Sequence, residues 1–327
     1  MKKILALTLT ILLVISMVAC GNNDQNNGGN TAEPESLKLG LGVLADASSS
    51  KLEVTINYAA VLLDKDGKIV DCEIDTVVAS AKSTDGVLAL PEEVLTKGEQ
   101  GDAYGMKAYS GIGKEWYEQA QALADYCVGK TKAEITGIAI GDDGKATDDT
   151  VKSFATMAIA DLVEVVAKAC DNAKDLGSKT GDTLKVASQT STASSKNAED
   201  GVDGSFTVST DICALTVDKD GKVTASVIDA VEPKIAFDKD GTTFTPSSDL
   251  RTKGEKGDEY GMKAYSGIGK EWYEQIEGFC AYLKGKTASE ISGIAMGDDG
   301  KTTDTDLLAT ATMAVSHFKA LVEKTLK

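Results

Sequence analysis

A long internal repeat constrains this chain more than any other feature. The sequence DKDGK occupies residues 64–68 and recurs at 218–222, an offset of 154. TKGE begins at Thr96 and again at Thr252, and the resulting offset of 156 then holds toward the C-terminus. Solenoid units repeat every 20–50 residues or so, so a repeat of this length indicates a duplicated domain. We place the two copies at 51–171 and 205–327, joined by a Ser/Thr/Gly-rich linker at 172–204.

The sequence patterns of the two copies predict the same order of strands and helices. Two β-rich segments flank the DKDG turn, at 52–63 and 69–78 in the first copy and at 206–217 and 223–231 in the second. Asp-Gly suits a hairpin turn, because glycine accepts a positive φ. An apolar helix face follows, with residues spaced at i, i+4, i+8, i+11 and i+15: Ile268, Trp272, Ile276, Phe279 and Leu283.

The sequence at the end of each copy predicts a short strand followed by a helix. Residues 134–140 and 290–296 read as a short strand that ends in a GDDGK turn. A last helix begins near Thr147 or Thr303, where 303–306 resembles a capping box. The expected fold class is therefore α+β, with two tandem copies of a small β-β-α-β-α domain.

Identity between the copies is unevenly distributed. Only 10 of 28 positions match between 51–78 and 205–232, whereas 22 of 24 match between 96–119 and 252–275. The second block reads TKGE(Q/K)GD(A/E)YGMKAYSGIGKEWYEQ. A demanding turn would explain its glycines. Its polar residues favour a ligand or partner surface, and both interpretations stay open here. The tyrosines of the loop are candidates for stacking on a planar ligand: Tyr104, Tyr109, Tyr260 and Tyr265.

The usual catalytic side chains are not shared by the two copies. The single histidine, His317, matches Asp161, and none of the five cysteines after Cys20 matches another cysteine. A site present in both copies therefore contains no catalytic residue of these types and no zinc ligands. The DKDG turns lack the ligand spacing of an EF-hand, so we expect hairpin turns and no metal site.

The N-terminus predicts export. MKKILALTLTILLVISMVAC combines two lysines with an apolar run too short for a comfortable membrane span. Residues 17–20 resemble the lipobox of bacterial lipoproteins, which implies removal of 1–19 and lipidation of Cys20. The polar segment that follows predicts a flexible tether over 20–50. The protein would then be lipid-anchored at the extracellular face of the cytoplasmic membrane.

The charge argues against one class of partner. Cleavage removes Lys2 and Lys3 and no acidic residue, which takes the formal net charge from −17 to −19. Such a chain is repelled by nucleic acid, so no nucleic-acid partner is expected.

A threonine segment near the end of each copy carries a family resemblance. TVKSFATMA (150–158) and DLLATATMA (306–314) resemble the attachment motif of FMN-binding domains, roughly Asp-x-x-Ser/Thr-Gly-Ala-Thr. Asp306 and Thr312 fit this pattern in the second copy, as Ser153 and Thr156 do in the first. Phe154 and Thr310 stand in place of the glycine. The resemblance implies that Thr156 and Thr312 carry FMN through a threonine phosphoester.

The whole arrangement is similar to the flavin-carrying lipoproteins of extracellular electron transfer in Gram-positive bacteria. That similarity implies one covalent FMN per domain, attached by a separate flavin transferase. A membrane quinone oxidoreductase would donate electrons, and extracellular iron or another acceptor would receive them. Two alternatives stay open: a surface lipoprotein that binds a small ligand without redox activity, and a structural or adhesive surface protein.

Overall fold

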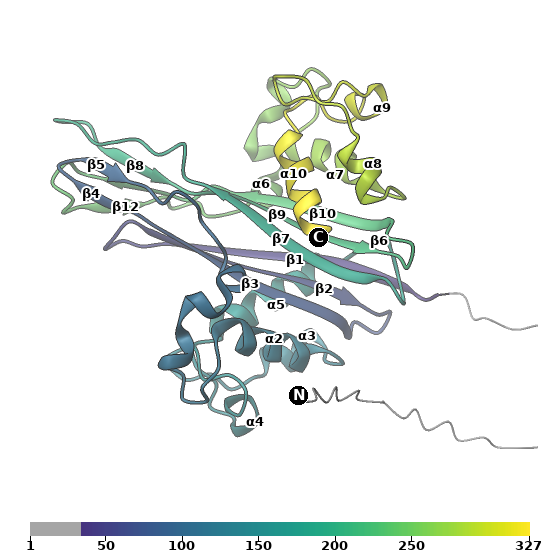
Figure 1. Cartoon of the computed structure of the whole chain (residues 1–327), viewed down its shortest axis with the longest axis horizontal. Helices are drawn as coiled ribbons and strands as arrows, with labels where there is room; N and C mark the ends of the chain where they lie inside the picture. The colour runs from purple at the N-terminus through teal and green to yellow at the C-terminus, as the bar shows by residue number, and fades with distance from the viewer. Residues whose placement is uncertain (1–33) are drawn as a thin grey trace, which may run out of the picture. The chain divides into compact units, whose positions relative to one another are not determined.

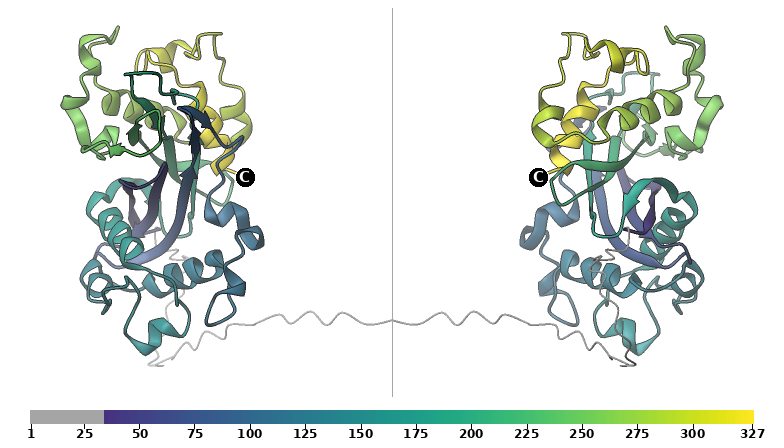
Figure 2. Two further views of the ribbon diagram at one scale, coloured as in Figure 1. Left: turned by 90° about the vertical axis from the view of Figure 1, so that its left-hand side faces the viewer. Right: turned by 90° about the vertical axis from the view of Figure 1, so that its right-hand side faces the viewer.

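The computed structural model describes residues 34–327, which form one compact unit. The expected signal peptide, Cys20 and the tether up to residue 33 lie outside the described residues. Within 34–327, no helix is both long and apolar enough to cross a bilayer. The fold is mixed α/β and consists of two similar halves (Figures 1 and 2).

Half 1 comprises residues 36–172. It contains the strands β1 (Ser36–Ala47), β2 (Glu53–Leu63), β3 (Ile69–Ser80), β4 (Lys82–Thr84) and β5 (Val87–Ala89), and then the helical elements α1 (Lys97–Gln100), η1 (Gly101–Tyr104), η2 (Met106–Ala108), α2 (Trp116–Cys127), α3 (Lys132–Thr136), α4 (Asp149–Lys152) and α5 (Ala160–Asn172).

Half 2 comprises residues 183–325 and repeats this order with one additional strand, β8. It contains the strands β7 (Thr183–Ser191), β8 (Gly204–Thr207), β9 (Ser209–Val217), β10 (Val223–Val231), β11 (Lys234–Phe237) and β12 (Phe244–Pro246), and then α6 (Lys253–Lys256), η3 (Gly257–Tyr260), η4 (Met262–Ala264), α7 (Trp272–Leu283), α8 (Ala288–Ser292), α9 (Thr305–Leu308) and α10 (Ser316–Thr325).

Each half builds an antiparallel sheet with the same strand order, β3-β2-β1 in half 1 and β10-β9-β7 in half 2. The inner faces of these sheets pack on each other through a shared core that includes Leu39 and Ile56 from half 1 and Ile212 and Ala214 from half 2. Helices cover the outer faces, so the sheets lie between two helical layers (Figure 1). The duplication has produced an internal dimer.

The central strands are buried on both faces. Along β2, Ile56 and Tyr58 belong to the shared core, whereas Ala59 and Val61 pack against the helices of half 1. This double burial explains why β2 reads as an apolar run without alternation. The expected hairpins are present: β2 pairs with β3 and β9 with β10, each across a DKDG turn in which Gly67 and Gly221 have φ of 76° and 73°.

Several expected boundaries were wrong. Residues 36–47 of the expected tether form β1, because this segment pairs with β2 and places Leu39 and Leu41 in the shared core. The expected linker 172–204 contains β7, which supplies the matching strand of half 2, and β6 (Lys174–Lys179), which pairs with β1. The linker also connects the halves directly, since Ser178 Oγ lies 2.9 Å from Thr216 Oγ1.

The predicted strand at 134–140 and 290–296 was also wrong. Thr131 and Thr287 form capping boxes with Glu134 and Glu290, and these start the short helices α3 and α8. The last helix is interrupted as well: Asp148 and Asp304, rather than Thr303, cap the four-residue helices α4 and α9, and α5 and α10 begin later. The predicted strand 206–217 is divided between β8 and β9, which belong to different sheets.

Candidate functional site

The segment 96–119, which half 2 repeats at 252–275 with 22 of 24 residues identical, begins with a capped helix docked on a half-buried carboxylate, that of Asp75. Thr96 caps α1 in a capping box with Glu99, and its hydroxyl donates to Asp75 Oδ2 at 2.6 Å. The Gly98 amide donates to Asp75 Oδ1 at 2.9 Å, and a Cβ at Gly98 would lie 2.6 Å from Oδ2. Half 2 repeats this arrangement, with the Gly254 amide donating to Asp229 at 3.0 Å. Burial raises the pKa of both carboxyl groups, although the hydrogen bonds oppose the shift.

A second carboxylate, the buried one of Glu115, closes the loop that follows. The Met106 amide donates to Glu115 Oε2 at 2.8 Å, and the Lys107 amide donates to Oε1 at 3.1 Å. In half 2, the Met262 amide donates to Glu271 at 2.8 Å. Glu115 and Glu271 are each 3% exposed. These acids therefore hold the loop closed, and their identity in both copies has a structural cause.

A buried glutamine connects this loop to the threonine segment. The Gln119 amide group donates from Nε2 to Ser110 Oγ (3.2 Å) and to the Lys114 carbonyl (3.1 Å). Its Oε1 accepts from the Thr156 amide at 2.8 Å and from the Met157 amide at 3.3 Å. Sequence reasoning selected the two segments separately, and this side chain brings them together.

Half 2 contains the same bridge with nearly the same geometry. Gln275 donates to Ser266 Oγ (3.2 Å) and to the Lys270 carbonyl (3.1 Å), and it accepts from the Thr312 amide at 2.9 Å. Gln119 and Gln275 are 0% and 1% exposed. The candidate site is therefore present twice. Sequence reasoning missed both glutamines, although a polar residue kept within an apolar helix face is a detectable signal.

The two threonines are partly exposed and lie beside the glutamines. Thr156 and Thr312 are half-buried, and each Oγ1 lies 3.4 Å from the Oε1 of its glutamine. The glycine loop faces them: a Cβ on Gly111 would lie 4.0 Å from Thr156 Cγ2, and one on Gly267 would lie 3.9 Å from Thr312 Oγ1. Glycine at these positions leaves the space beside each hydroxyl open.

The other residues from the family pattern lie on the short preceding helices. Ser153 is exposed, and its hydroxyl donates to the Thr150 carbonyl at 2.6 Å. Asp306 is exposed in the first turn of α9, where Asp304 supplies the cap. At the position of the family glycine, Phe154 packs against Tyr126 with ring centroids 5.4 Å apart, and the Thr310 hydroxyl donates to the Leu307 carbonyl at 2.9 Å.

The loop tyrosines fall into two groups. Tyr104 and Tyr260 are half-buried, and lysine ammonium groups lie 5.3 Å and 5.5 Å from their ring centroids. These rings are committed to internal packing. Tyr109 and Tyr265 are each 92% exposed, so both copies present the same aromatic side chain to solvent. They are the loop aromatics that remain available to a ligand.

A groove adjoins the site of half 1 on the other side of α2. Its volume is about 590 Å³, and its lining includes Glu73, Asp75, Lys114, Trp116 and Asp125. Burial, together with repulsion from Asp71, Asp125 and Asp75, raises the pKa of Glu73 to about 7.

The cysteines at 72, 127, 170, 213 and 280 are buried or half-buried, as structural cysteines are. Burial raises the pKa of Cys170 to about 11 and that of Cys280 to about 12, which leaves both protonated at neutral pH. In the part of the chain that the structure describes, no group of three or more His, Cys, Asp or Glu side chains is arranged to hold a metal ion.

Comparisons with known proteins give one partial similarity. No family model matches the chain, and no solved structure matches it. Over 86 residues the chain is 38% identical to a chlorophenol reductase of Desulfitobacterium hafniense. This match covers 23% of the chain and 26% of that reductase, so the chain corresponds to about a quarter of the relative's length.

Proposed function

We propose that the protein is a membrane-anchored extracellular electron carrier with one FMN covalently attached to each half, at Thr156 and Thr312. The observation that carries this proposal is the twice-repeated glutamine bridge. It joins the most strongly preserved loop to the backbone amide of a half-buried threonine, whose hydroxyl lies 3.4 Å from the same glutamine oxygen. The partial relative is named for a reduction, which is the class of chemistry that a flavin supports.

The side chains around each threonine fit an attached flavin nucleotide. Gln119 holds the Thr156 backbone, and thereby fixes the position of the hydroxyl that would be esterified. Gly111 faces Thr156 without a side chain of its own, and Lys107 in the same loop is exposed and supplies a positive charge for a phosphate. The exposed ring of Tyr109 offers a surface on which a planar ring stacks.

The flavin would supply the redox chemistry, and the protein would supply attachment and position. Since no acid–base residue is then required, the proposal agrees with the absence of shared histidines and cysteines from the two copies. A separate transferase would use a flavin dinucleotide as the FMN donor: the bond between Thr Oγ1 and the FMN phosphate would form as the diphosphate bond breaks, the nucleoside monophosphate would leave, and the hydroxyl proton would pass to solvent. A membrane quinone oxidoreductase would donate electrons, and extracellular iron or a similar acceptor would receive them. The lipid anchor at Cys20 would keep the carrier beside its donor.

Covalent attachment is tested by mass and colour. Protein co-expressed with a flavin transferase should gain two FMN phosphoesters and absorb visible light. Thr156→Ala and Thr312→Ala should each lose one adduct, and the double variant should lose both. Thr147→Ala is a matched control, because this exposed threonine lies nearby and should not affect either adduct.

Two results would redirect the proposal. Loss of an adduct in Ser153→Ala but not in Thr156→Ala would move the attachment to the neighbouring hydroxyl. Colourless, unmodified protein under these conditions would refute flavin attachment. Ligand binding in the groove beside Trp116 would then become the leading function.

A further inference from the structure

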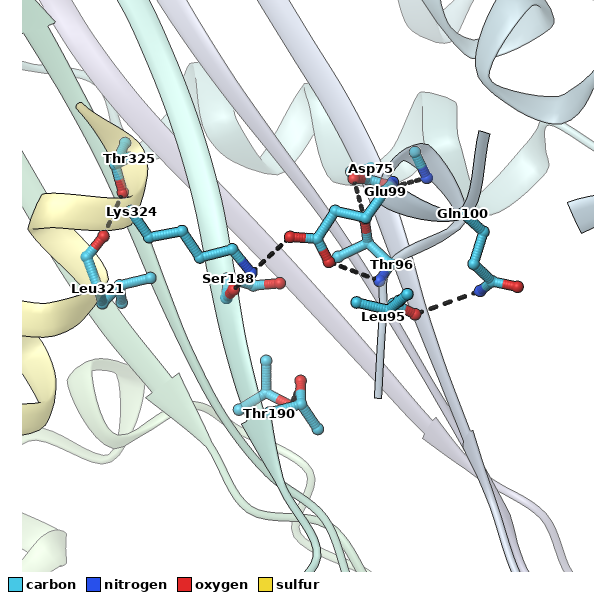
Figure 3. A network of polar contacts seen from close by, with 12 residues as sticks. Asp75, Leu95, Thr96, Glu99, Gln100, Ser188, Thr190, Leu321, Lys324 and Thr325 are labelled. Carbon is cyan, nitrogen blue, oxygen red and sulfur yellow. Dashed lines mark hydrogen bonds and ion pairs between the residues drawn. The ribbon is translucent and has the colours of Figure 1, made fainter. Parts of the chain in front are cut away.

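The last helix of each half carries a lysine that forms an ion pair with a glutamate of the other half. Lys168 in α5 pairs with Glu255 Oε1 at 2.7 Å, and Lys324 in α10 pairs with Glu99 Oε1 (Figure 3). The two lysines differ by the repeat offset of 156, and so do the two glutamates. The ion pairs are therefore one contact, made twice in opposite directions across the interface between the halves.

Each lysine is first anchored in its own half. Lys168 Nζ donates to the Val43 carbonyl in β1 at 2.6 Å, and Lys324 Nζ donates to the Ser188 carbonyl in β7 at 2.7 Å. Val43 pairs with Tyr58, and Ser188 pairs with Ile212, so these carbonyls occupy equivalent positions in the two sheets. A carbonyl that fixes the ammonium group lowers the entropy lost when the lysine engages the opposite glutamate.

The glutamates that pair with these lysines belong to the capping boxes of α1 and α6, at the beginning of the segments 96–119 and 252–275. The Thr96 amide donates to Glu99 Oε2 at 2.9 Å, and the Thr252 amide donates to Glu255 Oε2 at the same distance. Each glutamate thus uses one oxygen for its own helix cap and the other for the lysine of the opposite half. Figure 3 shows the connected contacts of Lys324, Glu99, Thr96 and Asp75.

The environment of these pairs makes the contact stronger than a fully exposed ion pair. The side chains of Lys168 and Glu255 are 24% and 32% exposed, and those of Lys324 and Glu99 are 38% and 29% exposed. Partial burial reduces solvent screening of the charges. Burial alone would raise the pKa of Glu255, but the hydrogen bonds from Lys168 and Thr252 lower it overall.

We propose that Lys168 and Lys324 are positioning residues, each of which holds the candidate site of the opposite half. Lys324 fixes the cap at which the half 1 loop begins, and Lys168 does the same for half 2. Neither candidate site is then complete within its own repeat. This proposal concerns loop order and goes beyond flavin attachment, so it stands or falls separately.

Hydrogen exchange of the full chain tests this crossed arrangement. In Lys324→Ala, amide exchange should rise in residues 96–110 of half 1 and stay unchanged in the equivalent residues 252–266 of half 2. Lys168→Ala should produce the reverse pattern. We expect a rise of roughly two- to fivefold, which corresponds to about 0.4–1 kcal/mol for a partly exposed ion pair.

A matched control lies in the same helix. Lys319 pairs with Glu323 at 3.2 Å within α10, so Lys319→Ala removes an ion pair without removing a contact between the halves. It should leave both loop segments unchanged. Lys324→Arg retains the charge and should restore most of the protection.

The pattern of exchange decides the outcome. A rise confined to the half that carries the mutation, or an equal rise in both halves, would overturn the proposal. Where flavin is attached, Lys324→Ala should lower occupancy at Thr156 but not at Thr312. Absence of flavin at both threonines would refute the proposed function, and the exchange experiment would still decide the role of the lysines.

Discussion

The two halves agree at the candidate site and differ immediately behind it. Both contain the capped helix on a half-buried aspartate, the loop closed by a glutamate, and the glutamine bridge. The groove wall of half 1 contains Glu73 and Asp125, whereas half 2 has Val227 and Ala281 at the matching positions. Tyr58, whose hydroxyl reaches Asp75 at 3.4 Å, is matched by Ile212.

This contrast separates shared structure from local divergence. Residues that contact the loop or the threonine are the same in both halves, while residues behind α2 have changed from acidic to apolar. The acidic lining of the half 1 groove is therefore a property of one half, and the glutamine-bridged loop is the property of both. Changes at matched positions can test this division.

The largest expected loss of stability follows from removing the glutamine bridge. Gln119→Met keeps the side-chain length but leaves the buried amides of Thr156 and Met157 without an acceptor. Each unsatisfied buried group costs about 1–3 kcal/mol, so the free energy of unfolding should fall by several kcal/mol in urea titrations. Gln275→Met should cost a similar amount. A much smaller loss of unfolding free energy in Gln275→Met would show that the two bridges, despite their similar geometry, contribute unequally to stability.

The next largest loss of stability is expected at the glycine that contacts the half-buried aspartate in each half. Alanine at Gly98 would place Cβ 2.6 Å from Asp75 Oδ2, and alanine at Gly254 would place it 2.9 Å from Asp229 Oδ2. Overpacking of this kind costs about 1–3 kcal/mol, with the larger loss expected in half 1. Gly111→Ala is the control, because its nearest neighbour would lie at 4.0 Å. Thermal unfolding that ranked Gly111→Ala with the other two would contradict this packing.

A smaller effect should appear in the pH dependence of stability. The pKa of Glu73 is raised from 4.5 to about 7, so the folded protein binds a proton that the unfolded chain has released. The stability associated with this group is present below pH 4.5 and is lost as pH rises toward about 7. Glu73→Val, which introduces the half 2 residue, should flatten this decline in denaturant titrations. An unchanged slope would place the proton elsewhere, for example on Asp211, whose pKa is raised to about 6 by burial.

Local signals in the sequence predicted the parts of the fold that local chemistry determines. The DKDG turns predicted the β2–β3 and β9–β10 hairpins, and the apolar spacing predicted α7 with Trp272 on its buried face. The strand predicted at 134–140 failed because a capping box at Thr131 outweighs the β-branched residues that follow. Counting that capping box would have identified α3.

Other features depend on contacts that no local pattern reveals. Residues 36–47 and 183–191 differ in sequence and precede the recognisable repeat, so their equivalence as β1 and β7 emerges only from their strand pairing. By sequence alone the polar residues of 96–119 favour a ligand or partner surface over a structural turn, but in the structure Glu99 and Glu115 serve a helix cap and loop closure. The residues left without such an internal role include the exposed Tyr109 and Tyr265.

The smallest effect on stability should come from these exposed tyrosines, and it gives the sharpest test of the shared site. Tyr109→Ala and Tyr265→Ala remove rings that are 92% exposed, so unfolding free energies should change by less than about 0.5 kcal/mol. If each ring stacks on a flavin attached to its own half, its removal should increase the fluorescence of that flavin. The increase is best measured in backgrounds that keep a single attachment threonine. Tyr109→Ala should then act only with Thr156 present, and Tyr265→Ala only with Thr312. Unchanged emission in both pairs would mean that the loop presents its tyrosines to a partner molecule instead of the cofactor.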